Sequence, residues 1–189
     1  MRFLLKDIRR RETVPAQVSA RVDTAPGESV LNGVADLDGT AWLVATNHRL
    51  AMVPSDGAAG WQRPWHEVDH ASWDRESGLL TVTWVHGGRP DQWRLGDERT
   101  FLQTLRERVQ ASVVLAEDLR LTGRRTGRAV IRQDLASGEL LDQVILGRGV
   151  REDEEVEAAA GEALSWLREQ VGLPSSGGSR TDEPEPPRE

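Results

Sequence analysis

Hydrophobic and polar residues alternate in short runs over the first hundred residues of the chain. In residues 79–85, Leu80, Val82 and Trp84 occupy every second position, which is the period of a half-buried β-strand. The turn-forming sequences DLDG, PSDGAAG, RESG and GGRP separate such runs at short intervals. The pattern therefore predicts consecutive antiparallel strands. The predicted strands lie in residues 29–36, 41–53 (two strands around a tight turn), 79–85 and 91–95.

The spacing of apolar residues changes after Gly96 and becomes helical. The positions that share one helical face are Phe101, Leu102, Leu105 and Val109. Asp97 precedes this run and is the expected N-cap, because its carboxylate can accept from the free N–H groups of a first turn. The first part of the chain is therefore expected to be a strand meander closed by one helix.

A second passage of strands and one long helix follows. The sequences SVVLAEDLRL, GRAVIRQDL and ELLDQVILG predict strands, and ASGE predicts the turn between the last two. Apolar residues then recur at helical spacing: Val156, Ala159, Ala160, Ala163, Leu164, Leu167 and Val171. The first turns of this helix are acidic, as the helix dipole favours, and Gly172 with Pro174 ends it.

The two ends of the chain have their own character. Residues 1–12 contain a short apolar group beside Arg9, Arg10 and Arg11, and are consistent with an amphipathic helix or with a strand. Residues 174–189 combine Pro, Gly, Ser and charge with nothing to bury, and are expected to be a disordered tail. The expected organisation is 1–19, 20–112, 113–173 and 174–189.

The hairpin sequence GTAWLVATNHRLAMV gives the most specific local prediction. If Asn47 and His48 form the turn, Ala45 opposes Leu50, and the pairs that follow are also apolar. The string G-x-x-x-L-x-x-T-N-x-R-L resembles the start of GRAM and bacterial pleckstrin-homology-like domains. The order of elements in residues 20–112 is similar as well: APGESVL, the hairpin, RPWHEVDHASWD, an alternating strand and a helix.

The resemblance implies a fold and a class of function. The fold would be α+β: an antiparallel pleckstrin-homology-like β-barrel or bent sandwich of about seven strands capped by a helix. A short β-rich extension and a long C-terminal helix follow it, either as a layer on the barrel, as a partner surface or as a second lobe. Members of these families are mostly lipid-, peptide- or protein-binding modules without catalysis, and no binding residue transfers by position.

The sequence HEVDH, residues 66–70, matches the H-E-x-x-H signature of zinc peptidases. That signature acts on a helix, where both imidazoles face one ion and the glutamate serves as general base. The alternative function is thus a small zinc metallopeptidase with His66 and His70 as ligands and Glu67 as catalytic residue. Its third ligand would be Glu76, His86 or Glu98. The resemblance instead makes residues 61–73 one strand or a bent pair, in which the imidazoles are about 13 Å apart.

Five arginines form the other candidate site. Arg120, Arg124, Arg125, Arg128 and Arg132 fall within thirteen residues. Guanidinium groups bind phosphates and carboxylates in bidentate fashion, so the group is a candidate site for an acidic ligand. The alternative is a solvated hairpin that pairs with the acidic run 152–157. Most tryptophans are expected in the core, with Trp61 or Trp93 as a candidate exposed anchor.

Composition narrows the function classes. The chain has no cysteine and a net charge of −7, which removes thiolate chemistry and argues against nucleic-acid binding. Without a signal-like segment, a cytoplasmic location is expected. The sequence therefore predicts a non-catalytic module without cofactor that binds a protein, peptide or acidic ligand. Peripheral membrane binding through residues 1–12 is a further alternative.

Overall fold

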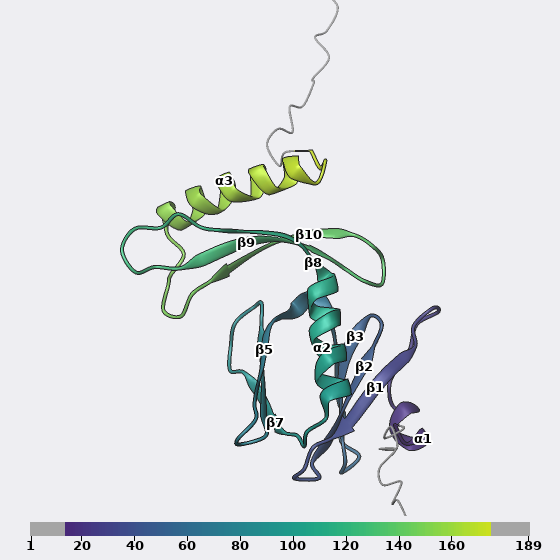
Figure 1. Ribbon diagram of the computed structural model, residues 1–189. Helices are drawn as coiled ribbons and strands as arrows, with labels where there is room; N and C mark the ends of the chain where they lie inside the picture. Colours follow the sequence, from purple (N-terminus) through teal and green to yellow (C-terminus); the bar gives the residue numbers. More distant parts are fainter. Residues whose placement is uncertain (1–13, 175–189) are drawn as a thin grey trace, which may run out of the picture.

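The computed structural model describes residues 14–174, and within them the fold is α+β with three antiparallel sheets (Figure 1). The first seven strands are β1 (Val30–Ala35), β2 (Ala41–Thr46), β3 (Arg49–Pro54), β4 (Trp61–Pro64), β5 (Val68–Asp74), β6 (Leu79–Trp84) and β7 (Asp91–Arg94). The remaining elements are α1 (Ala16–Ser19), the 3-10 helix η1 (Trp65–Glu67), α2 (Arg99–Ser112), β8 (Val113–Asp118), β9 (Gly127–Gln133), β10 (Leu140–Leu146) and α3 (Glu154–Gln170).

Strands β1–β4 form one sheet and β5–β7 form a second. In the hairpin of β2 and β3, Ala45 opposes Leu50, Val44 opposes Ala51 and Leu43 opposes Met52, so the predicted register is confirmed. Residues on both faces of this hairpin are buried, because one face packs in the barrel and the other packs on Val18 and Val22. The hairpin is therefore the central element of the first sheet.

The helix α2 closes the space between the two sheets. It contacts β1 on one side and β5 on the other. Its residues Phe101 and Leu105 lie in the same buried cluster as Leu43, Trp65 and Val82. The resemblance implied a barrel or a bent sandwich of about seven strands capped by a helix, and the two separate antiparallel sheets correspond to the sandwich. The unit formed by β1–β7 and α2 is called the barrel below.

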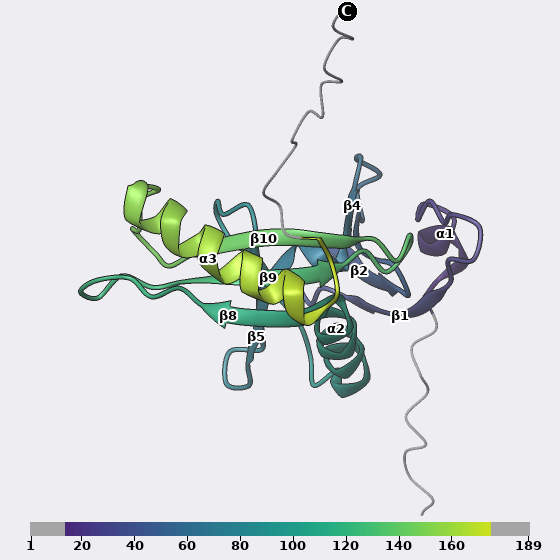
Figure 2. The ribbon, with the colours of Figure 1, turned by 90° about the horizontal axis from the view of Figure 1, so that it is seen from above.

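The extension packs as a layer across the barrel end where α2 terminates (Figures 1 and 2). Its sheet has the order β10-β9-β8, and α3 lies on the face directed away from the barrel. Leu167 of α3 packs with Ala129 and Ile131 of β9 in a separate core. Of the alternatives left open by the sequence, the layer on the barrel is thus the one found.

Polar side chains connect this outer layer to the barrel. Arg132 of β9 is 2% exposed, and its Nη1 donates to Ser112 Oγ at 2.9 Å. Gln143 Nε2 of β10 donates to the carbonyl oxygen of His66. Burial lowers the pKa of the Arg132 guanidinium, an effect that the nearby Asp69 carboxylate opposes. The interface thus holds a buried cation with few partners, which makes it sensitive to loss of any one of them.

A buried carboxylate attaches the segment before β1 to the turn between β2 and β3. Glu28 is fully enclosed and accepts from Arg49 and from Thr46 Oγ1. Burial raises the pKa of this carboxyl, but hydrogen bonds from Arg49, Thr46 and the Ala25 N–H outweigh it and lower the pKa to about 2. Asn47 adds two hydrogen bonds to the same segment.

Two local expectations are wrong. The N-cap of α2 is Glu98 and not Asp97, and it makes no side-chain cap hydrogen bond. The exposed tryptophan is Trp166 at 48%, whereas Trp93 is buried. Helical and strand periods alone do not report packing between distant elements.

The predictions for residues 1–12 and for the tail beyond 174 lie outside the described residues. Between residues 14 and 174, no helix combines the length and apolar character needed to cross a bilayer.

Replacing Ser112 by Ala is expected to destabilise the fold by about 2–3 kcal/mol, because the buried Arg132 cation loses its acceptor. Arg132→Met keeps the volume and removes the charge, so it is expected to change stability by less than about 1 kcal/mol. Denaturant unfolding of both variants and of the double variant measures the coupling. An equal cost of Ser112→Ala in both backgrounds would show that the hydrogen bond has no energetic role.

Glu28→Gln is expected to cost about 3 kcal/mol at pH 7, because the hydrogen bonds to a charged carboxylate are lost. The folded-state pKa of Glu28 is depressed, so its contribution is present above its unfolded value near 4.5 and disappears as pH falls toward 2. The difference in unfolding free energy between the two proteins should therefore shrink between pH 5 and pH 2. A difference independent of pH would contradict this account.

Candidate functional site

The HEVDH residues do not form a helical metal site. Pro64 is extended with φ −59° and ψ 150°, residues Trp65–Glu67 make one 3-10 turn, and Val68 is again extended with φ −79° and ψ 112°. His70 then lies exposed in β5. The bent pair of strands is confirmed, and the single helical face that a zinc peptidase needs is not formed.

The proposed third ligands do not complete the site either. Residues 14–174 contain no group of three His, Asp or Glu side chains placed to hold a metal ion. His66 contributes its carbonyl oxygen to the layer interface, and its Nδ1 is buried without a hydrogen bond. The zinc-peptidase alternative with Glu67 as general base therefore lacks its geometry.

The five arginines do not gather on one surface. Arg125 pairs with Asp153 and Glu155 at the start of α3, as the sequence alternative expected. Arg128 pairs with Asp69 of β5. Arg132 is buried in the layer interface, while Arg120 and Arg124 are exposed. Three of the five candidates thus bind groups of the protein itself.

A groove of about 420 Å³ runs between β5 and α2. Its lining includes every residue from Asp69 to Trp73, so residues of both faces of β5 contribute. Successive side chains of a strand point to opposite faces, so a lining of consecutive residues follows the edge of the strand. From α2 the groove takes Leu102, Leu105 and Val109 together with Arg106 and Gln110.

The two edges of the β5–β7 sheet differ. The β7 edge is partly occupied, because Arg94 O accepts from Leu37 N–H and Arg94 N–H donates to Asp36 Oδ1. At the other edge, within residues 14–174, β5 pairs with β6 alone. Every second residue of such an edge directs its N–H and C=O away from the sheet. The groove therefore lies beside main-chain groups able to pair with another strand.

Apolar side chains form the floor of the groove and polar ones its rim. Leu80 and Leu105 are almost fully buried, and Trp73, Leu102 and Val109 pack partly buried against the same core. His70, Arg106 and Gln110 are exposed at the rim. None of the five floor positions was identified as a site from the sequence, because β5 and α2 are far apart in the chain.

One solved structure is similar to part of this fold. The crystal structure of a DUF1696 family protein with a pleckstrin-homology domain, from Shewanella loihica PV-4, matches with a TM-score of 0.40 and 14% sequence identity. The match covers 46% of this chain and 85% of that protein. No protein-family model and no curated protein matches the chain.

With a TM-score of 0.40 and 14% identity, the similarity to the Shewanella protein does not assign this chain to a family. The two antiparallel sheets of β1–β4 and β5–β7 and the helix α2 that follows them have the order of elements expected from the resemblance in the sequence.

We expect that His66 and His70 do not form a zinc site. Addition of zinc should change the melting temperature of the wild type and of His70→Ala equally, because the two rings do not share a helical face. Thermal unfolding with and without zinc measures this, with atomic absorption as a check. A stabilisation by one equivalent of zinc that disappears in His70→Ala would restore the metal site.

Proposed function

We propose that the protein is a non-catalytic peptide-binding module, in which an extended segment of a partner adds to the edge of β5. The observation that carries this proposal is the coincidence of an open strand edge with an apolar groove along the same strand. In strand addition, main-chain hydrogen bonds supply affinity and pockets for alternate side chains supply specificity. Both requirements have counterparts between β5 and α2.

The groove has the chemistry of a site for a few apolar side chains. Its floor of Trp73, Leu102 and Val109 presents aromatic and aliphatic surface on both sides. Trp73 Nε1 lies beneath the surface without a hydrogen-bond partner, so a rearranged side chain has one donor to offer to a ligand. A volume of about 420 Å³ suits two or three side chains, which supports a weak and transient complex.

The rim favours an acidic group in the partner. Arg106 is exposed, and its side chain makes no hydrogen bond or ion pair to any residue in the range 14–174. Its guanidinium stands over the α2 side of the groove, where a carboxylate can bind it in bidentate fashion. We therefore infer a preferred ligand with apolar side chains at alternate positions and an acidic residue beside them.

Gln110→Trp tests the site by filling the groove. Gln110 is exposed and lines it, so a tryptophan there is expected to block the ligand with little effect on the fold. Gln103→Trp is the matched control, because Gln103 is also exposed on α2 but does not line the groove. Peptides selected by the full-length protein from a displayed random library serve as ligands.

The selected peptides are expected to bind Gln110→Trp at least about tenfold more weakly than the wild type, and Gln103→Trp equally well. Amide chemical shifts should change along residues 69–73. Equal affinity of all three proteins, or shift changes confined to other strands, would place peptide recognition elsewhere and refute the proposal.

A further inference from the structure

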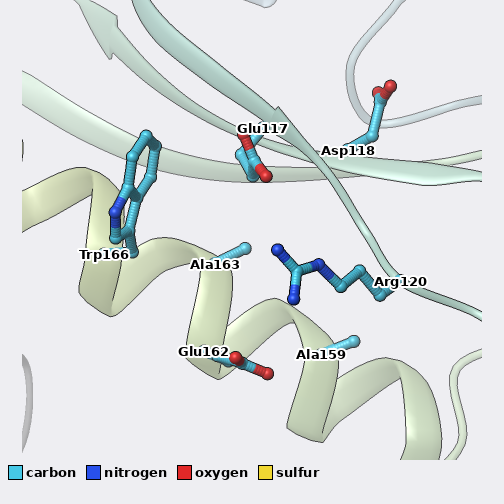
Figure 3. A pocket seen from close by; sticks show the side chains of 7 residues that line it. All are labelled: Glu117, Asp118, Arg120, Ala159, Glu162, Ala163 and Trp166. Carbon is cyan, nitrogen blue, oxygen red and sulfur yellow. The ribbon is translucent and has the colours of Figure 1, made fainter.

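A second groove lies between an edge strand and a helix in the outer layer. It has a volume of about 270 Å³ and runs between β8, at the edge of its sheet, and α3 (Figure 3). Glu117, Asp118 and Arg120 line it from the β8 side, and Glu162 and Trp166 line it from α3. Ala159 and Ala163 form a shallow floor, so main chain or a flat side chain can approach the helix closely.

Trp166 is the unusual aromatic residue of the molecule. All seven tryptophans lie within residues 14–174, and Trp166 is 48% exposed while the others are buried or largely covered. Its indole stands at one end of the groove, and the Arg120 side chain extends over the floor from the other (Figure 3). A half-exposed indole at the end of a concave surface is typical of an anchor for a partner.

The charge of the groove indicates the chemistry of that partner. The side chains of Glu117, Asp118 and Glu162 make no hydrogen bond or ion pair within residues 14–174, in contrast to those of Asp153 and Glu155, which both bind Arg125. Glu117 and Glu162 lie on either side of the Arg120 guanidinium, whereas Asp118 points away from it (Figure 3), so the lining carries more negative than positive charge. A cation placed against the indole gains both from its π face and from the neighbouring carboxylates.

The edge of β8 supplies the main-chain part of a site. Within residues 14–174 β8 pairs with β9 alone, so half of its N–H and C=O groups are directed away from the sheet. Val113 and Val114, at the start of the strand, are 37% and 38% exposed. An incoming strand can therefore bury apolar surface at one end of β8 and reach the acidic groove at the other.

We propose that β8 and α3 form a second binding site, which takes an extended basic peptide segment. The segment adds to the edge of β8, and one of its Arg or Lys side chains lies on Trp166 beside Glu117 and Glu162. Arg120 occupies the opposite end and weakens the site by its charge. The site is separate from the β5–α2 groove, and its ligand has the opposite charge.

The probe is a fluorescein-labelled peptide, Val-Arg-Val-Arg-Val-Arg, compared with Val-Glu-Val-Glu-Val-Glu. We expect the full-length protein to bind the arginine peptide and not the glutamate peptide in fluorescence anisotropy. Trp166→Ala is expected to weaken binding about tenfold. Arg120→Gln is expected to strengthen it about threefold, because a repelling charge is removed.

Matched variants separate the groove from the overall negative charge of the protein. Glu157→Gln and Arg124→Gln change the net charge as Glu162→Gln and Arg120→Gln do, but at exposed positions that do not line the groove. Only the groove variants should alter affinity by more than about twofold. Equal effects of each pair, or no binding at all, would overturn the proposal.

Two further readouts identify the occupant and the site. Gln110→Trp is expected to leave binding of the arginine peptide unchanged, so failure of the β5–α2 proposal and failure of this one are distinguishable. Analytical ultracentrifugation of the protein alone should show a monomer. A dimer that dissociates on Trp166→Ala would mean that a second copy of the chain, and not a basic peptide, occupies β8.

Discussion

The chain passes directly from the last residue of α2, Ser112, into the first residue of β8, Val113. No loop separates the two elements, so the direction of the capping helix sets the position of the outer sheet. The buried hydrogen bond from Arg132 of β9 to the same serine makes a second attachment at that point. Both candidate grooves depend on this junction, because one is lined by α2 and the other by β8.

Burial of Arg132 gives the junction directional contacts at a cost in desolvation. A guanidinium that is 2% exposed loses most of its hydration, and Ser112 recovers part of that loss. Purely apolar contacts would hold the layers together without selecting one orientation so strictly. The ion pair between Arg128 of β9 and Asp69 of β5 is a second polar contact that orients the outer layer relative to the barrel.

Local and short-range patterns account for what could be predicted from the sequence. The β2–β3 register follows from apolar pairs about one turn, and α3 follows from a long apolar stripe with acidic first turns. The N-cap Asp153, which accepts from Val156 N–H, was found only in the structure. The pairing of Arg125 with the acidic run 152–157 was one alternative from the sequence, but the positions of Arg128 and Arg132 could not be placed in this way. The partners of Arg132, Arg125 and Arg128 lie 20 to 59 residues away in the sequence. Whether each arginine is buried, paired or exposed therefore depends on packing between distant elements, which periodicity does not encode.

The HEVDH sequence shows the same limit from the other direction. A spacing of four residues brings two imidazoles together only on a helix, and the spacing itself does not establish the helix. Pro64 favours extended backbone and precedes a single 3-10 turn, after which the chain enters β5. The signature is therefore divided between two elements: His66 lies in the 3-10 turn, and His70 lies in β5.

The open edges of β5 and β8 affect the tendency of the protein to aggregate. A strand edge that can receive a partner can also receive the edge of a neighbouring molecule, which begins aggregation. With a net charge of −7, molecules repel one another before their edges meet. Acidic residues scattered over the surface thus protect colloidal stability, and this protection weakens in concentrated salt or in mild acid, where the repulsion is screened or neutralised.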